Sequence, residues 1–204
     1  MSARPIPFGD GAWRIPLPEG ANARAVLDAL LDVRGVVDAV VCERHGLVSF
    51  DPSAPVSSGD VARAVEKALT MAQGNDPPTR HVIPVRYDGI DLDDVARLCG
   101  LSPGDLIAVH TAADYTVVCV GFLPGFAYLG GLDARLQVPR RATPRPRVPA
   151  LSIAIAGPYT GVYPFASPGG WNIVGTALGF APFDPASGAA LALGDHVRFA
   201  RADS

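Results

Sequence analysis

The sequence predicts an α+β protein with two parts, an N-terminal lobe of alternating strands and helices followed by a β-barrel. Two observations support this prediction. Capped amphipathic helical patterns separate β-branched runs early in the chain, whereas short apolar runs interrupted by glycine and proline dominate the rest. With 204 residues, 49% of them hydrophobic, the chain is long enough for one or two domains with a sizeable core.

The N-terminal lobe follows the pattern strand, helix, hairpin, helix. Its predicted elements are a strand over residues 12–17, a helix over 23–34 capped by Asn22, strands over 36–42 and 47–50 around a turn, and a helix from Ser57 or Ser58 to about residue 73. A strand over residues 81–87 either completes a ferredoxin-like βαββαβ unit or opens the second domain. We place the boundary near Pro78, which gives an α/β lobe over residues 1–78 and a barrel domain over 79–204.

Two short helices begin the second part, over residues 91–99 with Asp91 as cap and from Ser102 onward with Ser102 as cap. The pair resembles a helix-turn-helix, but residues 101–113 contain no lysine or arginine that could meet phosphate, and the net charge of the chain is −3. We therefore expect no nucleic-acid partner. The strands predicted beyond these helices cover residues 115–122, 151–156, 171–175, 189–193 and 195–200.

No segment suggests a membrane or a secretory signal. The N-terminus lacks the apolar core of a signal peptide. The most apolar run, residues 117–132, is interrupted by Pro124 and four glycines, so it is too short and too broken to span a bilayer. We expect a cytoplasmic protein without a membrane partner.

Residues 121–175 have the composition of a binding pocket. Nine glycines and eight prolines lie in this stretch, which excludes a long helix. The stretch is rich in aromatic residues, which require burial or a ligand: Phe122, Phe126, Tyr128, Tyr159, Tyr163, Phe165 and Trp171. Five arginines face one aspartate here, so the block carries a charge of +4 and the remainder carries −7. Rigid loops and aromatic walls indicate a pocket, and the charge asymmetry indicates a local anion site or an acidic partner.

Motifs for common cofactors are absent. The sequence contains no GxxxxGK[ST], GxGxxG or GxSxG, and its four histidines lie too far apart for a local metal motif. We therefore expect this chain to bind no cofactor and no metal, and any use of ATP or biotin to require another polypeptide.

Three arginines alternate with prolines in the loop over residues 135–149, which is predicted to be extended. Arg140, Arg145 and Arg147 are candidate ligands for a carboxylate or a phosphate, because guanidinium pairs with both in a bidentate fork. The alternative is a solvated loop or a contact with an acidic partner chain.

The glycine-rich turns supply further candidates for substrate binding. Gly125 in the loop after Phe122, and Gly169 and Gly170 before Trp171, leave backbone amides open to an anion or oxyanion. The aromatic residues Phe122, Phe126, Tyr128 and Trp171 line a pocket in this hypothesis. In the alternative, the glycines form tight corners and the aromatic residues belong to the core.

Two residues are candidates for catalysis. His110 ends a predicted helix, where a histidine also has a favourable structural role at the negative end of the helix dipole. Ser167 could act as a nucleophile or, because no base is its neighbour in sequence, as a hydrogen-bond donor.

The runs GFLPGFAYLGGLD, PRRATPRPRVPA and SPGGW, in this order, resemble the carboxyltransferase C/D-type family. Its members are called allophanate hydrolase subunit 1, the sporulation-kinase inhibitor and the B subunit of 5-oxoprolinase. The resemblance implies an N-terminal α/β lobe followed by a cyclophilin-like β-barrel. His110 and Tyr115 in HTAADY match a family pattern, which strengthens the candidacy of His110.

The resemblance also implies a function. The main expectation is one component of an ATP-dependent 5-oxoprolinase, which opens the lactam of 5-oxoproline to glutamate. Such a component works with a C-type subunit of the enzyme, also called subunit 2-type, and with an A-type subunit that handles ATP. Little or no activity is expected from the chain alone. The alternatives are a binding protein that inhibits a histidine kinase and an allophanate or urea carboxyltransferase component.

The sequence departs from the family pattern at several positions. Tyr159 stands where the AGxQTG motif has glutamine, although Thr160 keeps its threonine, and both are candidate substrate-binding residues. Thr176 stands where an arginine is usual, and Leu151 stands where glycine is common. These departures bear on the identity of the substrate.

Overall fold

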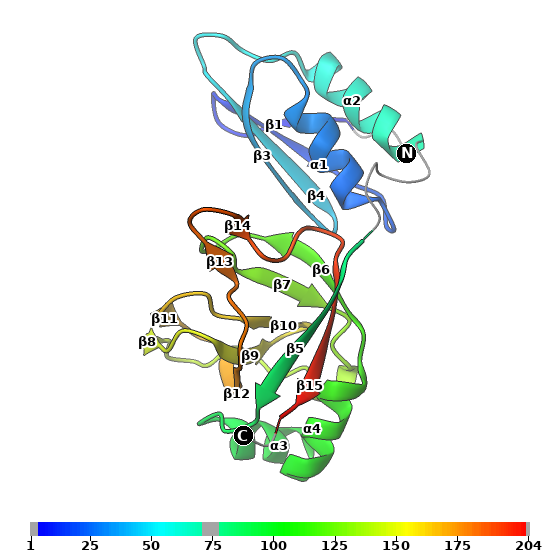
Figure 1. Ribbon diagram of the computed structural model, residues 1–204. Coiled ribbons are helices and arrows are strands. Elements are labelled where there is room, and N and C mark those ends of the chain that lie inside the picture. The colour runs from blue at the N-terminus through cyan, green and yellow to red at the C-terminus, as the bar shows by residue number, and fades with distance from the viewer. Residues whose placement is uncertain (1–3, 71–77, 203–204) are drawn as a thin grey trace. The chain divides into compact units, whose positions relative to one another are not determined.

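A computed structural model describes residues 4–70 and 78–202 of the chain (Figure 1). The chain divides into two compact units, Met1–Pro78 and Thr79–Ser204. No helix within the described residues is long and apolar enough to cross a membrane.

The first unit contains a four-stranded antiparallel sheet in the order β1-β2-β4-β3. Its elements are β1 (Ile6–Pro7), β2 (Ala12–Pro16), α1 (Ala23–Leu31), β3 (Val36–Cys42), β4 (His45–Phe50) and α2 (Ser58–Thr70). Helix α1 packs against β3 and α2. The predicted cap is confirmed, because the Asn22 side chain accepts a hydrogen bond from the Ala25 amide. The end of the second predicted helix, residues 71–73, lies outside the described residues.

The strand expected over residues 81–87 does not complete this lobe. It forms β5 (Arg80–Arg86), which pairs with β15 (His196–Arg201) and β12 (Asn172–Ala177) of the second unit. In the first unit the edge beside β2 is occupied by β1, a short strand that the sequence analysis did not predict. The first unit therefore departs from a complete βαββαβ unit at this edge.

The second unit is a closed barrel in the order β10-β7-β6-β15-β5-β12-β9. Beyond the strands already given, its elements are α3 (Leu92–Cys99), α4 (Pro103–Ala112), β6 (Tyr115–Val120), β7 (Ala127–Gly130), the 3₁₀ helix η1 (Ala134–Leu136), β8 (Arg145–Val148), β9 (Ser152–Ala156), β10 (Tyr159–Val162), β11 (Ser167–Gly169), β13 (Phe183–Asp184) and β14 (Gly188–Ala189). All barrel pairs are antiparallel except β5 with β15. Closure leaves the barrel without a free sheet edge.

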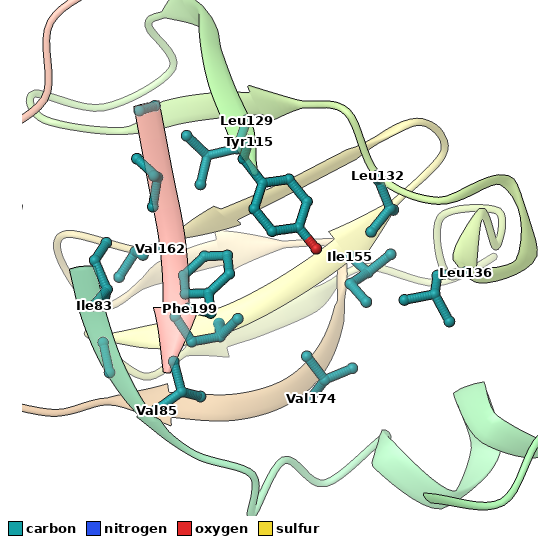
Figure 2. Packing of buried hydrophobic residues seen from close by; sticks show 14 of the residues in the cluster. Ile83, Val85, Tyr115, Leu129, Leu132, Leu136, Ile155, Val162, Val174 and Phe199 are labelled. Atoms are coloured by element: carbon teal, nitrogen blue, oxygen red, sulfur yellow. The ribbon is translucent and has the colours of Figure 1, made fainter. Parts of the chain in front are cut away.

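The barrel interior and the helices form one hydrophobic core. Helix α3 packs against β12 and α4 against β15, and the two helices lie together at one end of the barrel (Figure 1). In the interior, the rings of Tyr115 and Phe199 are 5.4 Å apart between centroids and both are buried (Figure 2). This core therefore fixes the positions of the barrel strands.

Two segments differ from the expectation. Most of residues 189–193, predicted as a strand, forms no strand, because the carboxylate of Asp195 accepts a hydrogen bond from the Ala192 amide and turns the chain before β15. Asp195, at the start of the strand predicted over residues 195–200, directly precedes β15 and is 3% exposed. The loop over residues 135–149, predicted as extended, contains η1 at its start and β8 at its end, and β8 pairs with β11.

Candidate functional site

The barrel sheet is covered on both faces near β9, β10 and β12. Successive side chains of a strand point to opposite faces, so Ile153 and Ile155 of β9 join the barrel core while Ala154 and Ala156 join a second cluster. The members of this outer cluster are Phe126, Val148, Ala154, Ala156, Tyr163, Trp171 and Ile173. The loops between the strands contribute most of its aromatic residues.

Three members of the outer cluster, Phe126, Tyr163 and Trp171, line a pocket of about 230 Å³. The pocket is lined by Phe122, Phe126, Tyr128, Arg140, Pro144, Tyr163, Pro168, Gly169, Gly170 and Trp171. The ring centroid of Phe126 lies 5.4 Å from that of Trp171 and 5.3 Å from that of Tyr163, with steep interplanar angles of 82° and 75°. These edge-to-face contacts hold the walls rigid. The volume suits a small metabolite better than a drug-sized ligand.

Arg140 brings the positive charge of the pocket. Its guanidinium carbon lies 6.0 Å from the centroid of the Trp171 ring, within the range of a cation–π contact. Burial raises the pKa of the Tyr163 hydroxyl, while a hydrogen bond from the Trp171 backbone and the charge of Arg140 act in the opposite direction. The pocket therefore combines the guanidinium of Arg140 with the hydroxyl groups of Tyr128 and Tyr163 and with apolar walls.

Two residues of the pocket, Gly169 and Phe122, have unusual backbone environments. A Cβ atom on Gly169 would lie 2.4 Å from the Tyr163 hydroxyl oxygen, so only glycine permits this close approach. Phe122 has a φ of 75°, rare for a residue with a side chain, and the residue is 59% exposed beside Phe126. Such a strained conformation at a pocket points to a functional constraint.

The structure brings seven of the predicted substrate-binding residues together in this pocket: Phe122, Phe126, Tyr128, Arg140, Gly169, Gly170 and Trp171. The sequence analysis did not assign Tyr163, Pro144 or Pro168 to the site. Tyr163 is an aromatic residue of the glycine-rich block, and the two prolines are sequence neighbours of predicted residues. These two features of the sequence could have indicated all three residues.

The other two predicted arginines do not line the pocket. Arg145 donates from Nη1 to Oδ2 of Asp91 at 2.9 Å and from Nη2 to Oδ1 at 2.6 Å, so a buried ion pair occupies its guanidinium. Arg147 is exposed and makes no hydrogen bond or ion pair with the described residues. Of the three arginines predicted to bind an anion, Arg140 alone lines the pocket, and its anion-binding role stays a prediction.

His110 of α4 and Thr160 of β10 lie against the barrel core and are not part of the pocket lining. His110 is fully buried, and its ring stacks on Phe199 at 4.8 Å between centroids. The Thr160 hydroxyl donates to the Ala154 carbonyl oxygen and so accepts from Nε2–H of His110 at 3.0 Å, which leaves Nδ1 to accept from the Tyr87 hydroxyl at 2.7 Å.

Burial lowers the pKa of His110 to about 3. The residue is therefore neutral at physiological pH, with its proton on Nε2, and both of its ring nitrogens have partners. This position does not support the predicted catalytic role, and Thr160 serves as a partner of His110 in the core.

The remaining predicted residues lie near the pocket but outside its lining. Ser167 is 8% exposed, and its hydroxyl has no hydrogen-bond partner within the described part of the chain. The Tyr159 ring packs against Tyr128 at 5.9 Å between centroids. Gly125 has a φ of 79° and approaches the Pro182 carbonyl so closely that a Cβ would lie 2.5 Å from its oxygen. Gly125 thus allows two loops to pack, whereas its predicted amide contact with a substrate stays a prediction.

The fold and the pocket define a closed β-barrel with an aromatic pocket on its outer face. The chain belongs to the carboxyltransferase domain family, subdomain C and D, whose model matches residues 7–192. A protein of Escherichia coli O157:H7 named as the B subunit of 5-oxoprolinase is 44% identical over 177 residues, which cover 83% of this chain and 80% of the relative. A protein of the same name from Haemophilus influenzae is 47% identical over 144 residues, with 68% of each chain covered.

Solved structures share the fold of this chain. TTHA0988 matches 95% of this chain with a TM-score of 0.80 and 37% identity, and this chain spans 40% of its length. PH0987 of Pyrococcus horikoshii matches over 98% of both chains with a TM-score of 0.59 and 33% identity. The urea amidolyase of Kluyveromyces lactis has a TM-score of 0.73 at 17% identity, a likeness of fold alone.

Proposed function

We propose that this chain is the B-type subunit of an ATP-dependent 5-oxoprolinase and that its aromatic pocket binds 5-oxoproline. Relatives named as B subunits of 5-oxoprolinase, at 42–47% identity, support the assignment. In this proposal a C-type subunit completes the active site, whereas an A-type subunit handles ATP, since the sequence has no nucleotide-binding motif.

One observation carries the proposal, the position of Arg140 over Trp171 in the pocket. The guanidinium has no carboxylate partner among the described residues, so it is available to a ligand. 5-Oxoproline presents a carboxylate that pairs with guanidinium and a small, flat lactam ring that packs on an aromatic face. Arg140 would hold the carboxylate while the indole of Trp171 and the ring of Tyr163 orient the lactam.

The pocket binds and orients better than it performs acid–base chemistry. Its lining contains tyrosines and an arginine but no carboxylate, histidine or cysteine among the described residues. Net hydrolysis adds water to the lactam carbonyl and breaks its C–N bond. In the proposed ATP-dependent enzyme, the phosphoryl group of ATP activates the resonance-stabilised amide and leaves as phosphate when water has added. A general base and the phosphate chemistry would come from the partner chains, so the isolated chain is expected to bind substrate with little turnover.

The test is reconstitution. The chain is co-expressed with the C-type subunit, the A-type subunit is then added, and glutamate release from 5-oxoproline is measured with and without ATP. Arg140→Gln should raise KM by about tenfold or more, because a charge-assisted hydrogen bond contributes about 1.5–3 kcal/mol. Arg135→Gln is the matched control, since Arg135 pairs with Asp133 on the surface outside the pocket. Absence of ATP-dependent glutamate release from the full complex would refute the proposal.

A further inference from the structure

Asp91 is the centre of a buried cluster that the sequence analysis did not foresee. Its side chain is 3% exposed and accepts from Arg141 Nη1 at 3.1 Å, from both terminal nitrogens of Arg145, and from the Ile173 backbone amide at 2.7 Å. The residue occupies the N-cap position of α3, yet its side chain makes no capping hydrogen bond. The carboxylate is therefore directed to partners that are distant in sequence.

The cluster is fixed to the barrel by the backbone. The Asp91 amide donates to the Ile173 carbonyl at 2.9 Å, so these two residues exchange two hydrogen bonds. Gly89 makes this approach possible, because a Cβ at that position would lie 2.3 Å from the same carbonyl oxygen. β12 carries a register shift between Ile173 and Gly175. Asp91 is thus hydrogen-bonded to the barrel wall next to an irregularity of β12.

The two arginines of the cluster belong to the loop that supplies part of the pocket. Arg140 and Pro144, which line the pocket, directly precede Arg141 and Arg145 in sequence. The Arg141 amide also donates to the Gly170 carbonyl at 2.8 Å. The side chains that meet Asp91 and those that face the ligand cavity thus come from adjacent residues of one short loop.

We propose that Asp91 is a positioning residue of the pocket, which holds the loop over residues 140–145 through Arg141 and Arg145 so that Arg140 stays over Trp171. Its negative charge also keeps Arg145 paired, so that a ligand carboxylate meets one guanidinium. Asp91 touches no ligand in this arrangement. It affects ligand binding only by fixing the position of the loop that carries Arg140. For its kinetic consequences the inference rests on the proposed function.

The kinetic test uses Asp91→Asn in the reconstituted complex. The isostere removes the charge and places an amide against the arginines, so the loop loses its anchor. We expect KM for 5-oxoproline to rise about tenfold or more while kcat stays within about threefold, because ligand placement weakens and the reacting groups are unchanged. Asp93→Asn, an exposed acid in the first turn of the same helix, should leave both constants unchanged. Equal KM values for Asp91→Asn and wild type would overturn the inference.

Arg145→Lys is a milder variant that keeps the charge of the cluster but not the bidentate geometry. It should give a smaller rise in KM than Asp91→Asn. This variant decides the question if Asp91→Asn does not fold. A loss of kcat without a change in KM, in either variant, would contradict a positioning role.

A second measurement needs no substrate. The chain has two tryptophans, Trp13 and Trp171, so in the Trp13→Phe variant all tryptophan fluorescence comes from Trp171 in the pocket. In this background Asp91→Asn should shift the Trp171 emission to the red and increase its quenching by acrylamide. The reason is that Trp171 is only 4% exposed in the unchanged chain, and release of the loop would expose the indole to water. Asp93→Asn should do neither. If wild type shows no oxoprolinase activity, the proposed function fails, while this emission still decides whether Asp91 holds the loop; an unchanged emission would overturn that claim.

Discussion

Replacing His110 with glutamine separates a structural role of this residue from a catalytic one. A glutamine amide can keep the hydrogen bond to Thr160 but leaves the Tyr87 hydroxyl without its acceptor and removes the ring that stacks on Phe199. A buried hydroxyl without a partner costs about 1–3 kcal/mol and a ring pair contributes about 0.5–1.5 kcal/mol. We therefore expect the barrel to lose about 1.5–4.5 kcal/mol of its free energy of unfolding at pH 7.

The pH dependence provides a sharper result. Burial lowers the pKa of His110 from 6.5 to about 3. Between these values the unfolded chain binds a proton that the folded chain excludes, so wild type loses stability as the pH falls below 6.5. From pH 7 to pH 5 this loss amounts to about 2 kcal/mol. His110→Gln lacks this contribution, so its deficit against wild type should shrink by that amount at pH 5.

The assay is urea unfolding followed by Trp171 emission in the Trp13→Phe background, because the two compact units can unfold separately. His45→Gln, an exposed histidine of the first unit, is the control. A deficit that is the same at pH 7 and pH 5 would refute the argument from burial. A folded His110→Gln with normal stability and turnover reduced by orders of magnitude would restore the catalytic assignment.

Three further substitutions test separate features. Gly169→Ala should destabilise the barrel by about 1–3 kcal/mol and reduce ligand binding, because its Cβ meets the Tyr163 hydroxyl, and adding Tyr163→Phe should restore part of the loss. Asp195→Asn should lower the unfolding free energy by about 2–3 kcal/mol at pH 7, because the carboxylate accepts from two backbone amides and bonds to His81. Ser102→Ala should cost about 1 kcal/mol through loss of the α4 cap.

For each of these three substitutions, a different measured result would contradict the structural explanation. The double variant at Gly169 and Tyr163 should be no more stable than Gly169→Ala if the clash is not the cause. The deficit of Asp195→Asn should shrink as the pH falls below 3.8 and through the lowered pKa of Asp195 in the folded chain, because the stabilisation by the charged carboxylate is lost in that range. A deficit that persists there would contradict the role of the charge. For Ser102, a threonine substitution should preserve stability.

The local chemistry of the sequence predicted most helix starts, because the atoms that form a cap lie within three residues of one another. Asn22 and Ser102 cap α1 and α4 as expected. The residues of the pocket were predictable from composition and family motifs, since aromatic and glycine residues are concentrated in one segment.

Contacts between distant residues could not be predicted in the same way. Asp91 has the sequence position of a helix cap, but its carboxylate bonds to residues 50, 54 and 82 positions away. The same contact withdraws Arg145 from the pocket. His110 points into the barrel because α4 packs against β15, a strand more than 80 residues later, and no pattern around His110 carries that information.

The parallel pair of β5 and β15 sets the order in which the barrel can be assembled during synthesis. β15 joins β5 to β6, yet it is the last barrel strand to leave the ribosome. Until residues 196–201 emerge, β5 and β6 each present an unpaired edge, and the nascent domain is an open sheet exposed to association with other chains. Truncation before His196 should therefore yield an aggregating chain rather than a smaller barrel, and protection from aggregation should appear only when β15 has been translated.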